Sequence, residues 1–188
     1  GVSVDQAATA FGRLTSIMGT QAIPFNEMAD SILKVGVNSV ATEGEIINVT
    51  TQISSIAAQA GFSTEEMIGL SGALASVRVP PELSRGLVTR VFGTIDKAVN
   101  SGGASLERLA RLSGRTSDQF AKDWRGTGGA AAFTDFLSGL KNAGGAARNE
   151  IESLGITSVR DVPVLLRLAN ASDSEGNAGG LLTQTMKD

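Results

Sequence analysis

The chain has 188 residues, enough for one domain or two with a buried core. Only 4% of the residues are aromatic, so a core must be filled mainly by Ala, Leu, Ile and Val. The formal net charge of -3 gives no reason to expect strong attraction to nucleic acid or to an anionic membrane. The chain contains no Cys and no His, which excludes disulfides, thiolate metal sites and imidazole catalysis.

The chain begins with Gly1 rather than Met and shows no signal segment. No apolar run approaches the roughly 20 residues that are needed to span a bilayer. We therefore expect an excerpt of a longer polypeptide.

Helical periodicity dominates the first half of the chain. Apolar residues recur at steps of three and four, which predicts one buried face on each of several helices. The predicted helices cover about 4–18, 24–36, 42–60, 63–77 and 81–98. Thr42 and Ser63 are suitable caps, each with Glu three residues later, and Pro81 suits a first helical turn.

One type of turn recurs along the chain. Gly61 can adopt the left-handed conformation that ends a helix, and Ser63 with Glu66 can form the capping box that begins the next. The segment 114–119 has the same order of residue types, and 155–160 keeps the glycine and a cap at Thr157 without the box. We interpret 42–77 as a helical hairpin at the centre of the domain.

Shorter helices are predicted for the second half of the chain. They cover 105–113, 116–124, 130–143, a segment ending near 154, and 159–169. The glycine-rich segments 102–103, 126–129 and 144–145 separate them, and we interpret these segments as hinges between helices. Met67, Trp124, Phe133 and Phe136 lie within the apolar stripes and are predicted to be core.

No alternating strand pattern occurs, so the sequence predicts an all-α fold. We expect a bundle of about eight to nine short helices with Gly-rich turns. One helical domain is predicted over 1–173. From 170 to 180 the composition changes to Ser, Asp, Gly and Asn, which predicts a flexible connection over 174–188 to the rest of a parent chain.

With this pattern established, a set of segments in the same order resembles the conserved region of tail tape measure proteins of long-tailed (siphovirus-like) phages and prophages. The segments are 42–47, 58–63, 70–77, 96–99, 102–103, 109–114, 120–121, 132–140, 154–160 and 165–169. The resemblance extends over roughly 5–173. The long coiled-coil and membrane-active stretches of that family are not present in this chain.

The resemblance implies a structural role rather than a catalytic one. A tape measure protein occupies the lumen of the tail tube, sets tail length during assembly and is ejected to assist genome delivery. Its expected partners are the tail tube protein, tail assembly chaperones and tail tip proteins, and self-association in the lumen is compatible with Gly- and Ala-rich helices. The implied location is the virion, and the host cytoplasm during assembly.

On this interpretation the chain is not an enzyme. It is expected to have no catalytic, cofactor-binding or metal-binding residues, no cofactor and no small-molecule substrate, and no membrane contact through this segment. The alternative is a non-enzymatic helical adaptor or scaffold domain of phage origin.

A less favoured alternative is a helix-turn-helix DNA-binding module at 106–124. Its basic residues are Arg108, Arg111, Arg115, Lys122 and Arg125. Acidic residues are interspersed at Glu107, Asp118 and Asp123. Phosphate binding needs a concentrated basic surface, so an ordinary αα-corner with a solvated face is favoured.

Two pairs of acids invite a test for glycoside hydrolysis, because some tape measure proteins carry a peptidoglycan hydrolase module. The pairs are Glu43 with Glu45 and Glu65 with Glu66. Hydrolysis requires two carboxyl groups that face each other across a cleft. Acids in the first turn of a helix are better explained by capping and by the helix dipole.

Overall fold

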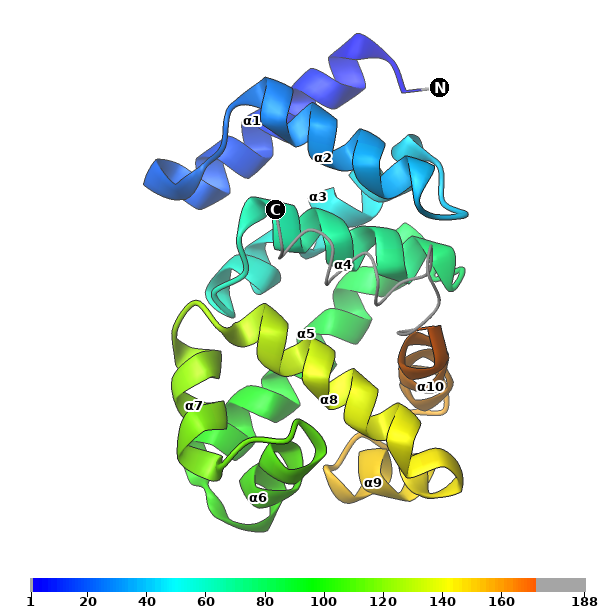
Figure 1. The fold of residues 1–188 in the computed structure, drawn as a ribbon. Coiled ribbons are helices and arrows are strands. Elements are labelled where there is room, and N and C mark those ends of the chain that lie inside the picture. The colour runs from blue at the N-terminus through cyan, green and yellow to red at the C-terminus, as the bar shows by residue number, and fades with distance from the viewer. Residues whose placement is uncertain (1, 172–188) are drawn as a thin grey trace.

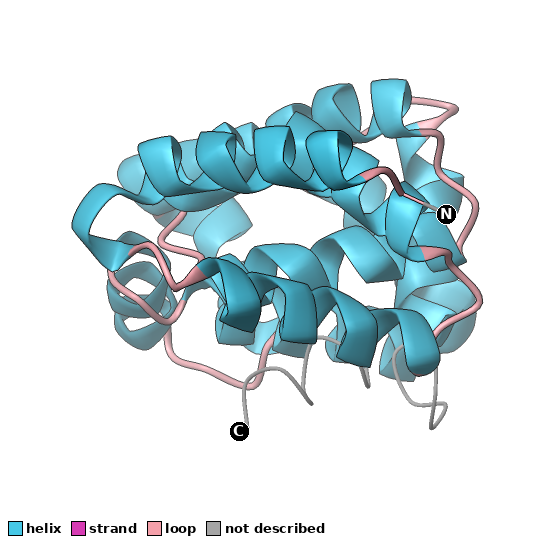
Figure 2. Ribbon diagram, turned by 90° about the horizontal axis from the view of Figure 1, so that it is seen from above, coloured by secondary structure: helices cyan, strands magenta, loops and turns pink. Residues whose placement is uncertain are grey.

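The computed structural model describes residues 2–171, and every regular element in this part is a helix (Figure 1) (Figure 2). The α-helices are α1 (Val4–Met18), α2 (Phe25–Val37), α3 (Glu43–Gln59), α4 (Thr64–Ser76), α5 (Pro81–Ser101), α6 (Gly103–Leu112), α7 (Ser117–Arg125), α8 (Gly129–Ala143), α9 (Ala147–Ser153) and α10 (Asp161–Ala171). Two 3-10 turns, η1 (Gly19–Gln21) and η2 (Gly144–Ala146), follow α1 and α8. In residues 2–171 no helix is long and apolar enough to cross a membrane.

The predicted all-α class is confirmed. The described part contains ten α-helices, slightly more than the eight to nine expected, and the seven-residue α9 is the predicted segment that ends near 154. The connection predicted over 174–188 lies outside the described residues.

Local capping explains where several helices begin. The predicted capping boxes form at the starts of α3, α4 and α7, and α1 has a further one that the sequence analysis did not predict. The expected cap at Thr157 is wrong. The hydroxyl of Ser158 accepts instead from the backbone amides of Arg160 and Asp161, so α10 begins two residues later than predicted.

Helix α4 is buried on nearly all sides. Every residue from 67 to 75 is buried, including the small residues Gly69, Gly72 and Ala73. Small side chains allow neighbouring helices to approach closely. α4 packs against α3 and α2, and Figure 1 shows the α3–α4 pair between the α1–α2 layer and the helices that follow.

An aromatic cluster joins the hairpin to the second half of the chain. The ring of Phe92 in α5 lies 5.3 Å from that of Phe62, and 5.2 Å from both Trp124 in α7 and Phe133 in α8. These separations are in the range of favourable aromatic pairs. The predicted core positions Trp124 and Phe133 therefore belong to one cluster that α5 organises.

Two close backbone approaches require glycine. A Cβ atom on Gly139 of α8 would lie 1.8 Å from the carbonyl oxygen of Leu112 at the end of α6. A Cβ on Gly61 would lie 2.1 Å from the Gly126 carbonyl oxygen, and one on Gly129 would lie 2.3 Å from that of Ala60. The segment 126–129 connects α7 to α8, as expected, and it is packed against the α3–α4 turn.

Candidate functional site

The paired acids lie at helix starts, as the capping interpretation expects. Glu45 Oε2 accepts from the Thr42 amide at 2.8 Å, and Glu66 Oε2 accepts from the Ser63 amide at 2.8 Å. The hydrogen bond from the Thr42 amide lowers the pKa of Glu45, whereas burial raises the pKa of Glu66. Glu45 and Glu66 are thus each engaged by the backbone of their own helix start. Among residues 2–171 no group of three or more acids is placed to hold a metal ion.

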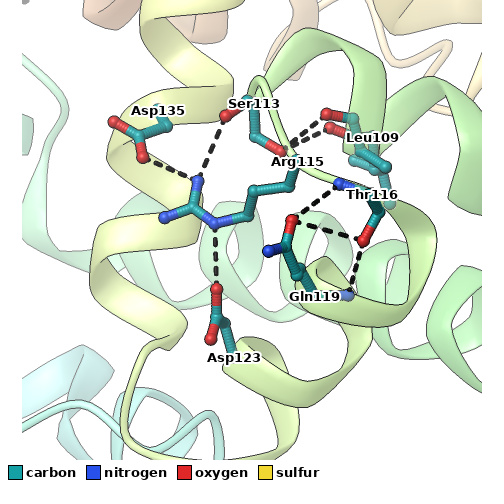
Figure 3. A network of polar contacts seen from close by, with 8 residues as sticks. Leu109, Ser113, Arg115, Thr116, Gln119, Asp123 and Asp135 are labelled. Carbon is teal, nitrogen blue, oxygen red and sulfur yellow. Dashed lines mark hydrogen bonds and ion pairs between the residues drawn. The ribbon is translucent and has the colours of Figure 1, made fainter.

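The αα-corner formed by α6 and α7 is held by Arg115 (Figure 3). Its Nε donates to Asp123 Oδ2 at 2.9 Å, and Nη1 donates to Asp135 Oδ2 at 2.6 Å and to the Ser113 carbonyl oxygen at 3.2 Å. The Arg115 side chain is only 16% exposed. The guanidinium therefore ties the α6–α7 turn to α7 and α8, and its donors are directed at acceptors within the protein.

The neighbouring arginines are engaged in the same way. Arg108 and Arg111 of α6 both donate to the Glu150 carboxylate of α9, Arg111 Nη2 at 2.9 Å from Oε2. Arg125 donates to the Val99 carbonyl oxygen at 2.8 Å. With Arg115, four of the five basic residues in the helix-turn-helix interpretation have acceptors in this chain. Arg111 and Arg125 are nevertheless exposed.

Glu150→Gln is expected to lower the free energy of unfolding by about 1 kcal/mol at pH 7, because it removes the charge that receives the two arginines. Burial raises the pKa of Glu150, but the hydrogen bonds from Arg108 and Arg111 outweigh it, so the pKa is lower than usual in the folded state. A lowered carboxyl pKa stabilises the folded state above the unfolded-state pKa, about 4.3, and this contribution is lost as the pH falls through the folded pKa.

The difference between the wild type and Glu150→Gln should therefore be full at pH 7 and shrink below about pH 4. Urea denaturation at several pH values measures it. Glu152→Gln in the same helix is the matched control, since Glu152 accepts only at 3.5 Å from Arg148 on the surface. Equal losses for the two variants, or a difference that grows in acid, would contradict the assignment.

An apolar stripe on α2 faces outward. Phe25, Leu33 and Val37 recur at helical spacing and are 49%, 52% and 81% exposed. The opposite stripe, with Met28 and Ile32, is buried as the sequence predicts. Phe25 also packs edge-on against Phe11, with the ring centroids 5.7 Å apart, so Leu33 and Val37 are the freest members of the stripe. Exposed apolar side chains on one helix face mark interaction surfaces. This second stripe was not predicted from the sequence, although the step of four along 25–37 is a signal for it.

Two surface hollows have volumes in the range of small-molecule sites. One, of about 630 Å³, lies between α1, α3 and the start of α5, and its lining includes the acids Asp5 and Glu82. The other, of about 520 Å³, lies over the Arg115 network and includes Lys122 and Gln119. In the first hollow Arg13 and Asp5 are both exposed. In the second hollow Asp123 and Asp135 both accept from Arg115, and the Ser113 hydroxyl donates to the Leu109 and Ala110 carbonyl oxygens.

No family model, curated protein or solved structure matches this chain. The described residues define an all-α protein, and its candidate functional features are surfaces for contact with other molecules. Its assignment to a particular family is a proposal.

Proposed function

We propose that this chain is a segment of a phage tail tape measure protein. In this role it occupies the lumen of the tail tube, sets tail length during assembly, and is ejected to assist genome delivery. It acts by contact and by length, not by catalysis. Its proposed partners are the tail tube protein, assembly chaperones and tail tip proteins, and its proposed location is the virion.

The observation that carries the proposal is the ordered resemblance along 5–173. The resembling segments include the α3–α4 hairpin, whose second helix is the most enclosed, and the αα-corner that Arg115 holds. They therefore coincide with elements on which the fold depends. The all-α architecture is consistent with a protein that works as a chain of helices.

The exposed stripe of α2 supports a role in assembly, because an apolar face on a surface helix is suited to another protein. The same stripe equally favours the second candidate, a helical adaptor or scaffold domain of phage origin that does not measure length. Both functions require partner contact, and only the first requires that chain length determine tail length.

Tail length distinguishes the tape measure function, here called the ruler function, from the adaptor function. In-frame deletion of whole helical units of the parent chain, outside the segment 1–173, is expected to shorten the tail in proportion to the residues removed, by up to about 1.5 Å per helical residue. Electron microscopy of purified tails measures the change. The control replaces the deleted unit by an unrelated helical sequence of equal length, which should restore tail length. Tails of unchanged length after deletion would refute the ruler function and leave the adaptor.

A further inference from the structure

A groove on the surface has two walls. The α4–α5 turn and the start of α5 form one wall, and the start of α10 forms the other. The groove encloses about 410 Å³. Its lining includes Leu83 and Val159, which are 46% and 88% exposed, together with Pro163 and Val164. The volume is suited to a few inserted side chains rather than to a whole domain. Exposed apolar residues gathered in a concave surface indicate a binding site.

Positive charge surrounds this apolar lining. Four arginines line the groove, Arg78, Arg90, Arg160 and Arg167, against the two acids Glu82 and Asp161. Arg90 donates to both Asp161 oxygens, at 2.6 and 2.7 Å, and the Asp161 side chain is 3% exposed. This bidentate pair joins α5 to α10 and neutralises one acid. The groove is thus locally basic in a chain with a net charge of -3.

Three of these arginines keep donors for a partner. Arg160 and Arg167 are exposed, and within residues 2–171 their side chains have no hydrogen-bond or ion-pair partner. Arg78 reaches only Glu45, at 4.0 Å, and both side chains are exposed. Exposed pairs at this distance contribute little. The guanidinium groups are therefore free to contact carboxylates outside the chain.

Arg78 occupies a backbone conformation that glycine would adopt more easily. Its φ is 62°, the only positive φ of a non-glycine residue in the described part of the chain. The turns after α3, α6 and α9 close with the same two hydrogen bonds and have glycine at this position, for example Gly61 and Gly114. An unfavourable backbone conformation retained at a groove indicates that the side chain has a role.

We propose that this groove binds an acidic amphipathic helix of a partner protein. Apolar residues one turn apart on that helix contact Leu83 and Val159, and acids beside them pair with Arg78, Arg160 and Arg167. A groove between two helices with an apolar lining suits a helix, which satisfies its own backbone hydrogen bonds. The proposal rests on the groove alone and holds for either proposed function.

The test uses fluorescence anisotropy with three labelled probes at about 50 mM salt, where screening of exposed charges is weak. The first is an amphipathic peptide of about 16 residues, long enough to form a helix, with Leu on one face and Glu elsewhere. The second has Lys in place of Glu, and the third is a short DNA duplex. We expect saturable binding of the Glu peptide at micromolar concentrations and none of the Lys peptide.

Variants locate the site. Val159→Asp is expected to weaken binding of the Glu peptide about tenfold without affecting folding, because Val159 is an exposed apolar anchor. Arg167→Gln and Arg78→Gly should each weaken it about threefold. Arg78→Gly should also leave the denaturation midpoint unchanged or higher, which separates a binding role from a folding role. The matched control is Arg85→Gln, since Arg85 is exposed on α5 but does not line the groove.

Three results would overturn the proposal. They are no binding of the Glu peptide, equal weakening by Arg85→Gln and the groove variants, and tighter binding of the DNA duplex than of the Glu peptide.

Discussion

Gly139→Ala is expected to lower the free energy of unfolding by about 3 kcal/mol or more. The added methyl would lie 1.8 Å from the Leu112 carbonyl oxygen and 2.6 Å from its carbonyl carbon. Both atoms belong to backbone at the end of α6, so no flexible side chain can move aside. The α6–α8 crossing must open, and the buried residues around it, including Leu109 and Phe136, lose contacts.

Urea denaturation monitored by circular dichroism measures this loss. The control is Gly93→Ala in α5, where a Cβ meets nothing within 4 Å. Removing glycine from an exposed helical position should raise stability by about 0.5–1 kcal/mol. The two Gly-to-Ala changes in helices therefore have opposite signs. A Gly139→Ala protein as stable as the wild type would mean that α8 does not approach Leu112 this closely.

Gly61→Ala is the second substitution with a large expected effect. It should lower the free energy of unfolding by about 3–4 kcal/mol. Two costs combine at this residue. Its φ of +76° is in the region that disfavours residues with a side chain, and its Cβ would lie 2.1 Å from the Gly126 carbonyl oxygen. The substitution therefore strains the α3–α4 turn and also separates it from the loop before α8.

Gly114→Ala isolates the first cost, because Gly114 has a φ of +66° but open space around its Cβ position. The Gly114→Ala substitution should lower the free energy of unfolding by only about 1 kcal/mol. The difference between the two variants measures the contact between the hairpin and the segment 126–129. If Gly61→Ala and Gly114→Ala lower the free energy of unfolding by the same amount, that contact does not contribute to stability.

Helix positions and starts were predictable because their signals are local. The cap at Ser63 and the box closed by Glu66 act over three residues, and the stripe of α5 repeats every three or four. Such local patterns predict a helix even when the packing of the helices against one another is unknown. The same is true of the glycine that ends α3, since its left-handed conformation is a property of the turn itself.

The candidate surfaces were less predictable, because they depend on which apolar positions remain uncovered. Leu33 and Val37 of α2 look in the sequence like ordinary core residues, and Val159 like part of a helix. Only the packing of α2 shows that Leu33 and Val37 stay exposed, whereas Phe25 of the same stripe packs against Phe11. Similarly, the sequence shows that Arg78 follows a helix but not that it lies beside a groove.

By itself the sequence determined that this chain forms short capped helices with an Ala- and Leu-rich core, because those signals span about one helical turn. Only the tertiary structure decided which side chains from different helices contact one another. Arg90 and Asp161 are 71 residues apart, Arg108 and Glu150 are 42 apart, and their pairing follows from how α5, α6, α9 and α10 pack. The glycine contacts are of the same kind, since a sequence shows a missing side chain but not the backbone that takes its place.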